Sequence, residues 1–105
     1  MEKREYALSD KDRLIVEWKF RRGKITKFII QYIALIDGDW RPVIRYDTKH
    51  SHAHQHRFHY KHKENDRRIS IAGGGNVKNY KFIFNQAQKY IGQNWEKIKD
   101  WFLNT

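Results

Sequence analysis

The strongest chemical signal in the chain is a run of histidines. All six lie between His50 and His62, within DTKHSHAHQHRFHYKHK. Imidazole has an ordinary pKa of about 6.5, so it can both give and take protons near neutral pH, and it is also a common metal ligand. The segment therefore predicts a metal site, an acid–base pair, or a polar strand whose histidines are ordinary surface residues.

We favour metal-free acid–base chemistry on RNA. RNA carries its own nucleophile, the 2′-hydroxyl, so cleavage needs a base for that hydroxyl, an acid for the leaving oxygen and a cation for the phosphorane charge. We expect His54 and His56 to be base and acid, in an order that the sequence leaves open. Arg45 would stabilise the phosphorane, and Asp47 would orient one imidazole and raise its basicity.

A metal site is the alternative. Histidines two apart on a strand point to the same face, so an H-x-H pair can bind one ion. Zinc or another divalent transition metal would then be the cofactor, with His52, His54 and His56 as ligands. Neutral imidazoles among so many cations disfavour a dication, and we therefore expect no cofactor. His59 and His62 are expected to be ordinary residues, the latter in a charged turn.

The net charge points to a polyanionic partner. The 105 residues include 22 Lys and Arg against 12 Asp and Glu, a formal net charge of +10, and the surplus is concentrated between Arg41 and Arg68. Such a surplus favours RNA, although it could also serve only solubility. The alternative to a ribonuclease is a non-catalytic module that binds nucleic acid or a protein partner and whose histidines tune affinity with pH. The residues that we expect to contact nucleic acid surround the proposed catalytic groups: Tyr46, Lys49, His50, Arg57 and Lys61.

Composition excludes several other classes of protein. The chain has no cysteine, which rules out disulfides, thiolate chemistry and the commonest structural zinc sites. Its first residues do not resemble a signal peptide, and no apolar run approaches the length of a membrane span. We expect a single domain over residues 1–105, cytoplasmic and without membrane contact.

Alternating and β-favouring residues predict the strands that would position these groups. The expected strands are Leu14–Phe20, Ile25–Ile36 and Trp40–Thr48, with hairpins around Gly23 and at Asp37-Gly38. Alternation continues through the histidine segment, with Phe58 and Tyr60 toward the core, and RISIA gives a short final strand. Met1–Arg13 shows no clear period and is expected to be a frayed lead-in or a short helix.

Apolar residues at steps of three or four predict one amphipathic helix, from about Asn79 to Leu103, that packs on the sheet. Asn76 or Asn79 could cap its start, and Gly92 could break it in two. The four tryptophans are expected in the core. The predicted fold is α+β: an antiparallel sheet of four to five strands packed by a C-terminal helix, with an edge strand that would permit a homodimer.

The stretch YIALIDGDWRPVIRYDTKHSHAHQHRF resembles small bacterial and archaeal toxins of the TumE-like type and related uncharacterised families. They share a strand, a tight turn, a second strand ending in R-[YFW]-D-[NT], and an H-x-H a few residues later. The matching residues are Arg45, Tyr46, Asp47, Thr48, His54 and His56, with His50 matching a histidine of some relatives. The resemblance covers about residues 28 to 60, and it leaves the H-x-H open between His52/His54 and His54/His56. It implies a toxin that acts on RNA, with a cognate antitoxin as partner.

Overall fold

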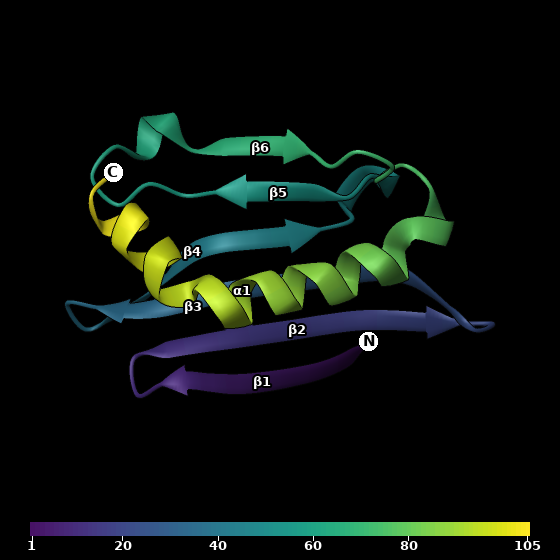
Figure 1. Cartoon of the computed structure of the whole chain (residues 1–105), viewed down its shortest axis with the longest axis horizontal. Coiled ribbons are helices and arrows are strands. Elements are labelled where there is room, and N and C mark those ends of the chain that lie inside the picture. The colour runs from purple at the N-terminus through teal and green to yellow at the C-terminus, as the bar shows by residue number, and fades with distance from the viewer.

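A computed structural model describes all 105 residues and shows a six-stranded antiparallel sheet with one helix on one side (Figure 1). The strands follow in chain order, each beside the next: β1 Glu2–Ser9, β2 Asp12–Arg21, β3 Lys24–Ile36, β4 Asp39–Asp47, β5 His54–Arg57 and β6 Arg67–Ser70. The helix α1 spans Tyr80–Leu103, and short 3₁₀ turns lie at η1 Lys49–Ser51, η2 Lys63–Asn65 and η3 Val77–Asn79. The α+β class is confirmed, but the sheet has six strands rather than four to five.

The additional strand is β1, where a frayed lead-in or a short helix was expected. β1 pairs with β2 along nearly its whole length, with Arg4 opposite Val16. As an edge strand beyond the helix, it is exposed on both faces and shows almost no burial. Its sequence therefore carries no apolar alternation from which a strand could have been predicted.

Both predicted hairpins are present. Arg22 and Gly23 have φ values of 51° and 76°, and Asp37 and Gly38 have values of 52° and 82°. Two consecutive residues with positive φ make the turn whose twist matches that of the flanking strands. These turns bring β2, β3 and β4 together as the centre of the sheet.

The core lies between these central strands and α1. The predicted inner face of β3 is confirmed, because Phe28, Ile30, Tyr32 and Ala34 are almost completely buried. An irregularity in β4 follows Pro42, since Ile33 pairs with Pro42 whereas Tyr32 pairs with Ile44, which leaves Val43 without a partner. This extra residue reverses the alternation, so the residues before it point to the opposite side from the one they would face in an uninterrupted strand.

Trp40 shows the effect of this bulge. It pairs with Leu35 on the side away from the helix and is 37% exposed, and Trp101 on α1 is 39% exposed. The expectation that all four tryptophans lie in the core was therefore wrong for these two. Trp18 and Trp95 do pack against the core.

α1 is one continuous helix, and Gly92 does not break it. Asn76 caps the η3 turn that precedes α1, because its side chain accepts a hydrogen bond from the backbone N–H of Lys78. Asn79 instead donates to the carbonyl of Gly73. The structure contains no helix that combines the length and apolar composition needed to cross a membrane.

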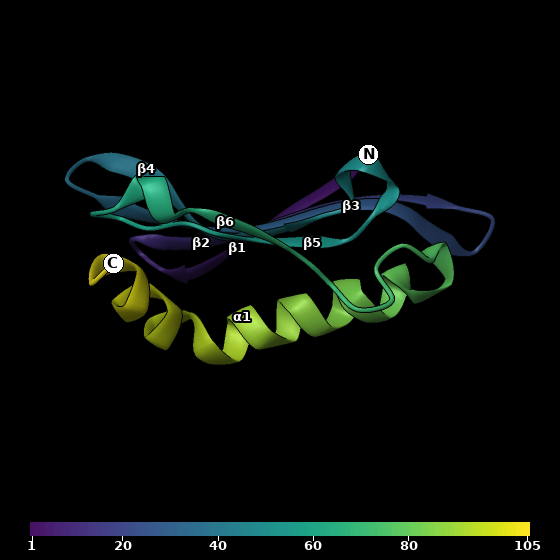
Figure 2. The same ribbon diagram turned by 90° about the horizontal axis from the view of Figure 1, so that it is seen from above.

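A single helix is narrower than this sheet. With its side chains a helix is about 10 Å wide, whereas six strands at about 4.8 Å spacing span roughly 24 Å. α1 packs on β3 and β4, with Phe84 also reaching Trp18 of β2. Figure 2 shows the two layers, with no second α-helix on the other side of the sheet. The helix-free face and the helix side of β5 and β6 therefore remain uncovered.

A buried carboxylate fixes α1 to the sheet. Asp12 is 2% exposed, accepts hydrogen bonds from Ser9 and from the hydroxyl of Tyr32, and lies 3.2 Å from Nζ of Lys99 on α1. Burial by itself would raise the pKa of Asp12, but hydrogen bonds from Ser9, Tyr32 and Lys99 together hold that pKa below its ordinary value of 3.8.

Asp12→Ala should lower the free energy of unfolding by about 3 kcal/mol, because it leaves a buried hydroxyl and an ammonium group without their anion. The exposed Asp10→Ala is the matched control and should cost little. Since the folded pKa of Asp12 lies below 3.8, its contribution is complete above that pH and is lost as the pH falls through the folded value. Urea unfolding of both variants across pH measures this, and equal losses in the two variants would contradict it.

Candidate functional site on the helix-free face

The register of β3, β4 and β5 brings the predicted catalytic residues together. Ile29 and Gln31 alternate with the buried residues of β3, so they point away from the helix. The side chains paired with them across β4 and β5 share that face: Asp47 opposite His54, and Arg45 opposite His56. We therefore call this group, together with the residues that line the adjacent cavity, the helix-free site.

β5 is shorter than the alternating segment predicted. It ends at Arg57. The N–H of Phe58 still donates to the carbonyl of Val43 on β4 at 3.4 Å, and from Tyr60 onward the backbone pairs with the end of α1. The N–H of Tyr60 donates to the carbonyl of Phe102 at 3.3 Å, and that of His62 donates to the carbonyl of Thr105 at 2.9 Å. Tyr60 and Phe58 do pack against the core, as expected.

Asp47 is the centre of the helix-free site. Its Oδ2 lies 3.2 Å from Nε2 of His56 and 3.5 Å from Nε of Arg45. Its Oδ1 accepts a hydrogen bond from the backbone N–H of Lys49 at 3.1 Å. With a side chain only 10% exposed, Asp47 is a carboxylate that holds an imidazole and a guanidinium in place.

His56 is partly buried, with its Nε2 toward Asp47 and its ring stacked on Phe58 at 6.3 Å between centroids. Burial lowers the pKa of His56 below 6.5, Asp47 opposes this, and the charges of Arg45, Arg68 and His54 lower it further. The neutral imidazole therefore predominates at a lower pH than in an ordinary histidine, which suits a general base.

His54 shares the face but is less accessible than expected. It is 8% exposed, its Nδ1 is buried without a hydrogen-bond partner, and its ring lies 5.0 Å from that of His52. It does not line the cavity beside Asp47. The two histidines, which the sequence analysis treated as equivalent, therefore differ in the structure: His56 lines the cavity and His54 does not.

An open cavity of about 660 Å³ lies beside Asp47. Arg45 and His56 line it, and so does His50, which η1 holds in a left-handed conformation with φ of 63°. Thr48 anchors the start of η1, because its hydroxyl accepts a hydrogen bond from the backbone N–H of Phe28. The charged groups around the cavity are Lys27, Arg45, Lys49 and Arg68, with Glu17 and Asp47.

Arg68 was missed in the sequence. It lies opposite His56 on β6 and lines the same cavity. The predicted short strand RISIA, which begins at Arg68, could have indicated that an arginine lies beside the histidine strand. Only the pairing of β6 with β5 decides which of the adjacent arginines, Arg67 or Arg68, faces the site.

Three of the expected nucleic-acid contacts lie elsewhere. Tyr46 is 8% exposed on the helix side, where its hydroxyl accepts a hydrogen bond from Gln55. Arg57 also points to the helix side, opposite Ile44 in the register. Lys61 is exposed in the loop after β5, outside the cavity. Lys49 and His50 do line the cavity. Tyr46 and Arg57 each follow a residue of the helix-free site along their strand, and successive strand residues point to opposite faces, so both point to the helix side.

His59 and His62 pair with carboxylates outside the helix-free site. His59 Nδ1 lies 3.2 Å from Asp66, and its ring packs on Trp101 at 5.1 Å. His62 Nδ1 lies 3.2 Å from Glu64 in the same turn. His62 is exposed in its charged turn, whereas His59 is largely covered by these contacts.

The alternative metal ligands His52, His54 and His56 do not form a metal-binding group. The structure shows no cluster of three or more histidine and carboxylate side chains arranged to hold an ion.

Comparison with known proteins gives one match. The whole chain, residues 1–105, matches a family described as "Domain of unknown function (DUF7718)". No curated protein and no solved structure matches the chain.

The pKa of His56 should respond to its neighbours in opposite directions. Asp47→Asn removes the charge that raises it and should lower it further, whereas Arg68→Gln should raise it. Imidazole C–H chemical shifts followed by NMR across pH measure both changes, with His62 as the internal control in the same spectra. A His56 pKa that neither substitution moves would contradict the proposed arrangement.

Proposed function

The chain belongs to the DUF7718 family, and we propose that it binds RNA at the helix-free site and cleaves it there without a metal ion. The observation that carries the proposal is the contact of one buried carboxylate, Asp47, with both His56 and Arg45 beside an open cavity. A base, a cation and a group that orients them are thereby supplied within one site.

Phosphate binding is the first step. The cavity is lined by four lysine and arginine side chains against two carboxylates, and Asp47 is already in contact with one of the arginines. Arg68 makes no ion pair in the structure. Arg45 contacts Asp47 through its Nε, so its two terminal nitrogens are free to bind a ligand. Guanidinium groups bind phosphate oxygens through two parallel hydrogen bonds, so these arginines suit an RNA backbone.

Acid–base chemistry follows at the bound phosphate. The Nδ1 of His56 makes no hydrogen bond and takes the proton of the 2′-hydroxyl, while Asp47 stabilises the imidazolium that forms. The oxygen of the hydroxyl attacks the adjacent phosphorus, and Arg45 stabilises the charge of the phosphorane. The leaving 5′-oxygen then takes a proton, and the products are a 2′,3′-cyclic phosphate and a free 5′-hydroxyl.

His50 is the better partner for His56 in this step. It is exposed and lines the same cavity, whereas His54 is buried and does not line that cavity. We therefore assign the role of acid to His50. His54 acts through His56, because its charge is one of those that lower the pKa of His56.

The toxin role and a cognate antitoxin are proposed on the resemblance of the Arg45–Asp47 segment alone. Growth arrest of cells that express the wild type, and its absence with His56→Ala, would support a toxin.

His56→Ala should reduce the rate of RNA cleavage by about a hundredfold or more, the usual effect of losing a general base. His50→Ala should have a similar effect, and the two losses should not add, because the groups act as a unit. The measurement uses purified protein and a labelled RNA with chelator present, and the wild-type rate should be the same without chelator.

Two controls make this result specific. His62→Ala removes a histidine outside the site and should retain the wild-type rate. A substrate with 2′-deoxyribose should resist cleavage, because it lacks the nucleophile. Cleavage that persists in His56→Ala, or that chelator abolishes, would refute the mechanism.

Binding of single-stranded RNA should weaken steeply with salt. Four phosphate contacts, one for each lysine or arginine of the cavity, would give a slope of about −2.8 in log affinity against log salt concentration. Fluorescence anisotropy measures the slope, and Arg68→Gln should reduce it by about 0.7. Binding that does not depend on salt would show that the positive charge of this cavity does not hold RNA.

A further inference from the structure

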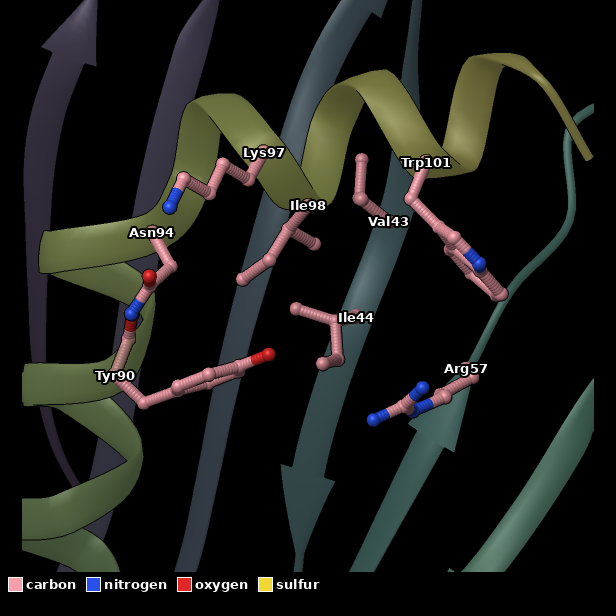
Figure 3. Close-up of a pocket in the computed structure, with 8 residues that line it drawn as sticks. All are labelled: Val43, Ile44, Arg57, Tyr90, Asn94, Lys97, Ile98 and Trp101. Carbon is pink, nitrogen blue, oxygen red and sulfur yellow. The ribbon is translucent and has the colours of Figure 1, made fainter.

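The second open surface, on the helix side, contains a smaller pocket that none of the chemistry above uses. It has a volume of about 240 Å³ and lies between the C-terminal half of α1 and strands β4 and β5. Its residues are Val43, Ile44, Arg57, Tyr90, Asn94, Lys97, Ile98 and Trp101 (Figure 3). The pocket lies on the opposite side of the sheet from the helix-free site.

The pocket has an apolar floor and aromatic sides. Ile44 and Ile98 form its centre, and Tyr90 and Trp101 stand on either side of them (Figure 3). Both aromatic side chains are about 40% exposed, so part of each ring faces solvent. Exposed aromatic rings around an aliphatic floor favour a flat apolar ligand.

Arg57 gives the pocket its polar group. Its Nε donates a hydrogen bond to Oε1 of Gln55 at 2.8 Å, and Gln55 in turn donates to the hydroxyl of Tyr46 at 2.6 Å. The guanidinium also lies over the ring of Trp101, 5.8 Å from its centroid. These contacts fix the orientation of Arg57 and leave its two terminal nitrogens free, and these nitrogens extend below Ile44 to the side of the pocket on which Tyr90 lies (Figure 3).

The positive charge of this guanidinium is not balanced in the structure. Arg57 makes no ion pair, and the residue directly opposite it on β6 is another arginine, Arg67. Lys97 adds a third cation, and no carboxylate lines the pocket. Like charges placed opposite each other across two strands are destabilising, so a bound anion would relieve this repulsion.

We propose that the pocket binds a compact aromatic carboxylate. The carboxylate pairs with the terminal nitrogens of Arg57 and accepts a hydrogen bond from Tyr90, while the ring lies on Ile44 and Ile98 beside Trp101. One fixed guanidinium matches the geometry and the single charge of a carboxylate. The volume falls below the range of drug-sized pockets, which restricts the ligand to one or two fused rings.

A matched pair of probes tests the charge requirement. Titration calorimetry should show that naphthalene-2-carboxylate binds the full chain at least tenfold more tightly than naphthalene-2-carboxamide, because a hydrogen-bonded charge contributes about tenfold or more in affinity. In NMR spectra, the indole N–H of Trp101 should shift on addition of the carboxylate. Equal affinity for the two probes, or no binding of the carboxylate at millimolar concentration, would overturn the proposal.

Two variants locate the interaction. Arg57→Gln should weaken binding of the carboxylate to the level of the amide and leave the amide unchanged, which also shows that the pocket is still folded. Arg68→Gln removes an arginine from the neighbouring strand on the opposite face and should leave the affinity unchanged. Equal losses in both variants would mean that the probe responds only to net charge. Arg57→Gln should retain RNA cleavage, so this result is independent of the proposed ribonuclease.

Discussion

The width of one helix against a six-stranded sheet is the constraint on which the other features of this molecule depend. α1 can cover only about the width of two or three strands, and it packs on β3 and β4 with contacts to β2. Beyond that band no helix covers the sheet on either side, and β1 and β6 are almost entirely exposed. The open surfaces are therefore a consequence of having one helix, and both candidate binding regions lie on them.

β5 shows how few residues are needed to supply two surfaces. His54 and His56 point to the helix-free side, and Gln55 and Arg57 point to the helix side. The two histidines contribute to the site built around Asp47. Gln55 and Arg57 instead belong to the hydrogen-bonded chain with Tyr46 that fixes the guanidinium of Arg57. A shift of one residue in register would exchange the two sets, so the pairing of β4 with β5 determines both sites.

Two buried carboxylates, Asp12 and Asp47, each hold together side chains from different elements. Asp12 joins β2, β3 and α1 through Ser9, Tyr32 and Lys99, and so fixes the helix over the central strands. Asp47 does the corresponding work on the other face, where it holds His56 and Arg45. In both places the carboxylate is nearly inaccessible, and it joins a near neighbour in the chain to a partner on another element: Ser9 to Tyr32 and Lys99 around Asp12, and Arg45 to His56 around Asp47.

The sequence by itself determined the α+β class, the hairpins at Gly23 and Asp37-Gly38, the inner face of β3 and the extent of α1, because these follow from local φ preferences and from apolar periodicity. It also identified Arg45, Asp47 and His56, whose spacing on adjacent strands places them on one face. Only the tertiary structure decided that β1 is a strand, because an exposed edge needs no apolar pattern. The tertiary structure alone also decided that Trp40 faces away from the helix and Arg57 toward it. It alone decided that His54 is buried and that Arg68 belongs to the helix-free site. Those outcomes depend on a bulge, on strand register and on the place where one helix leaves the sheet uncovered, all of which are set by pairing between segments distant in the chain.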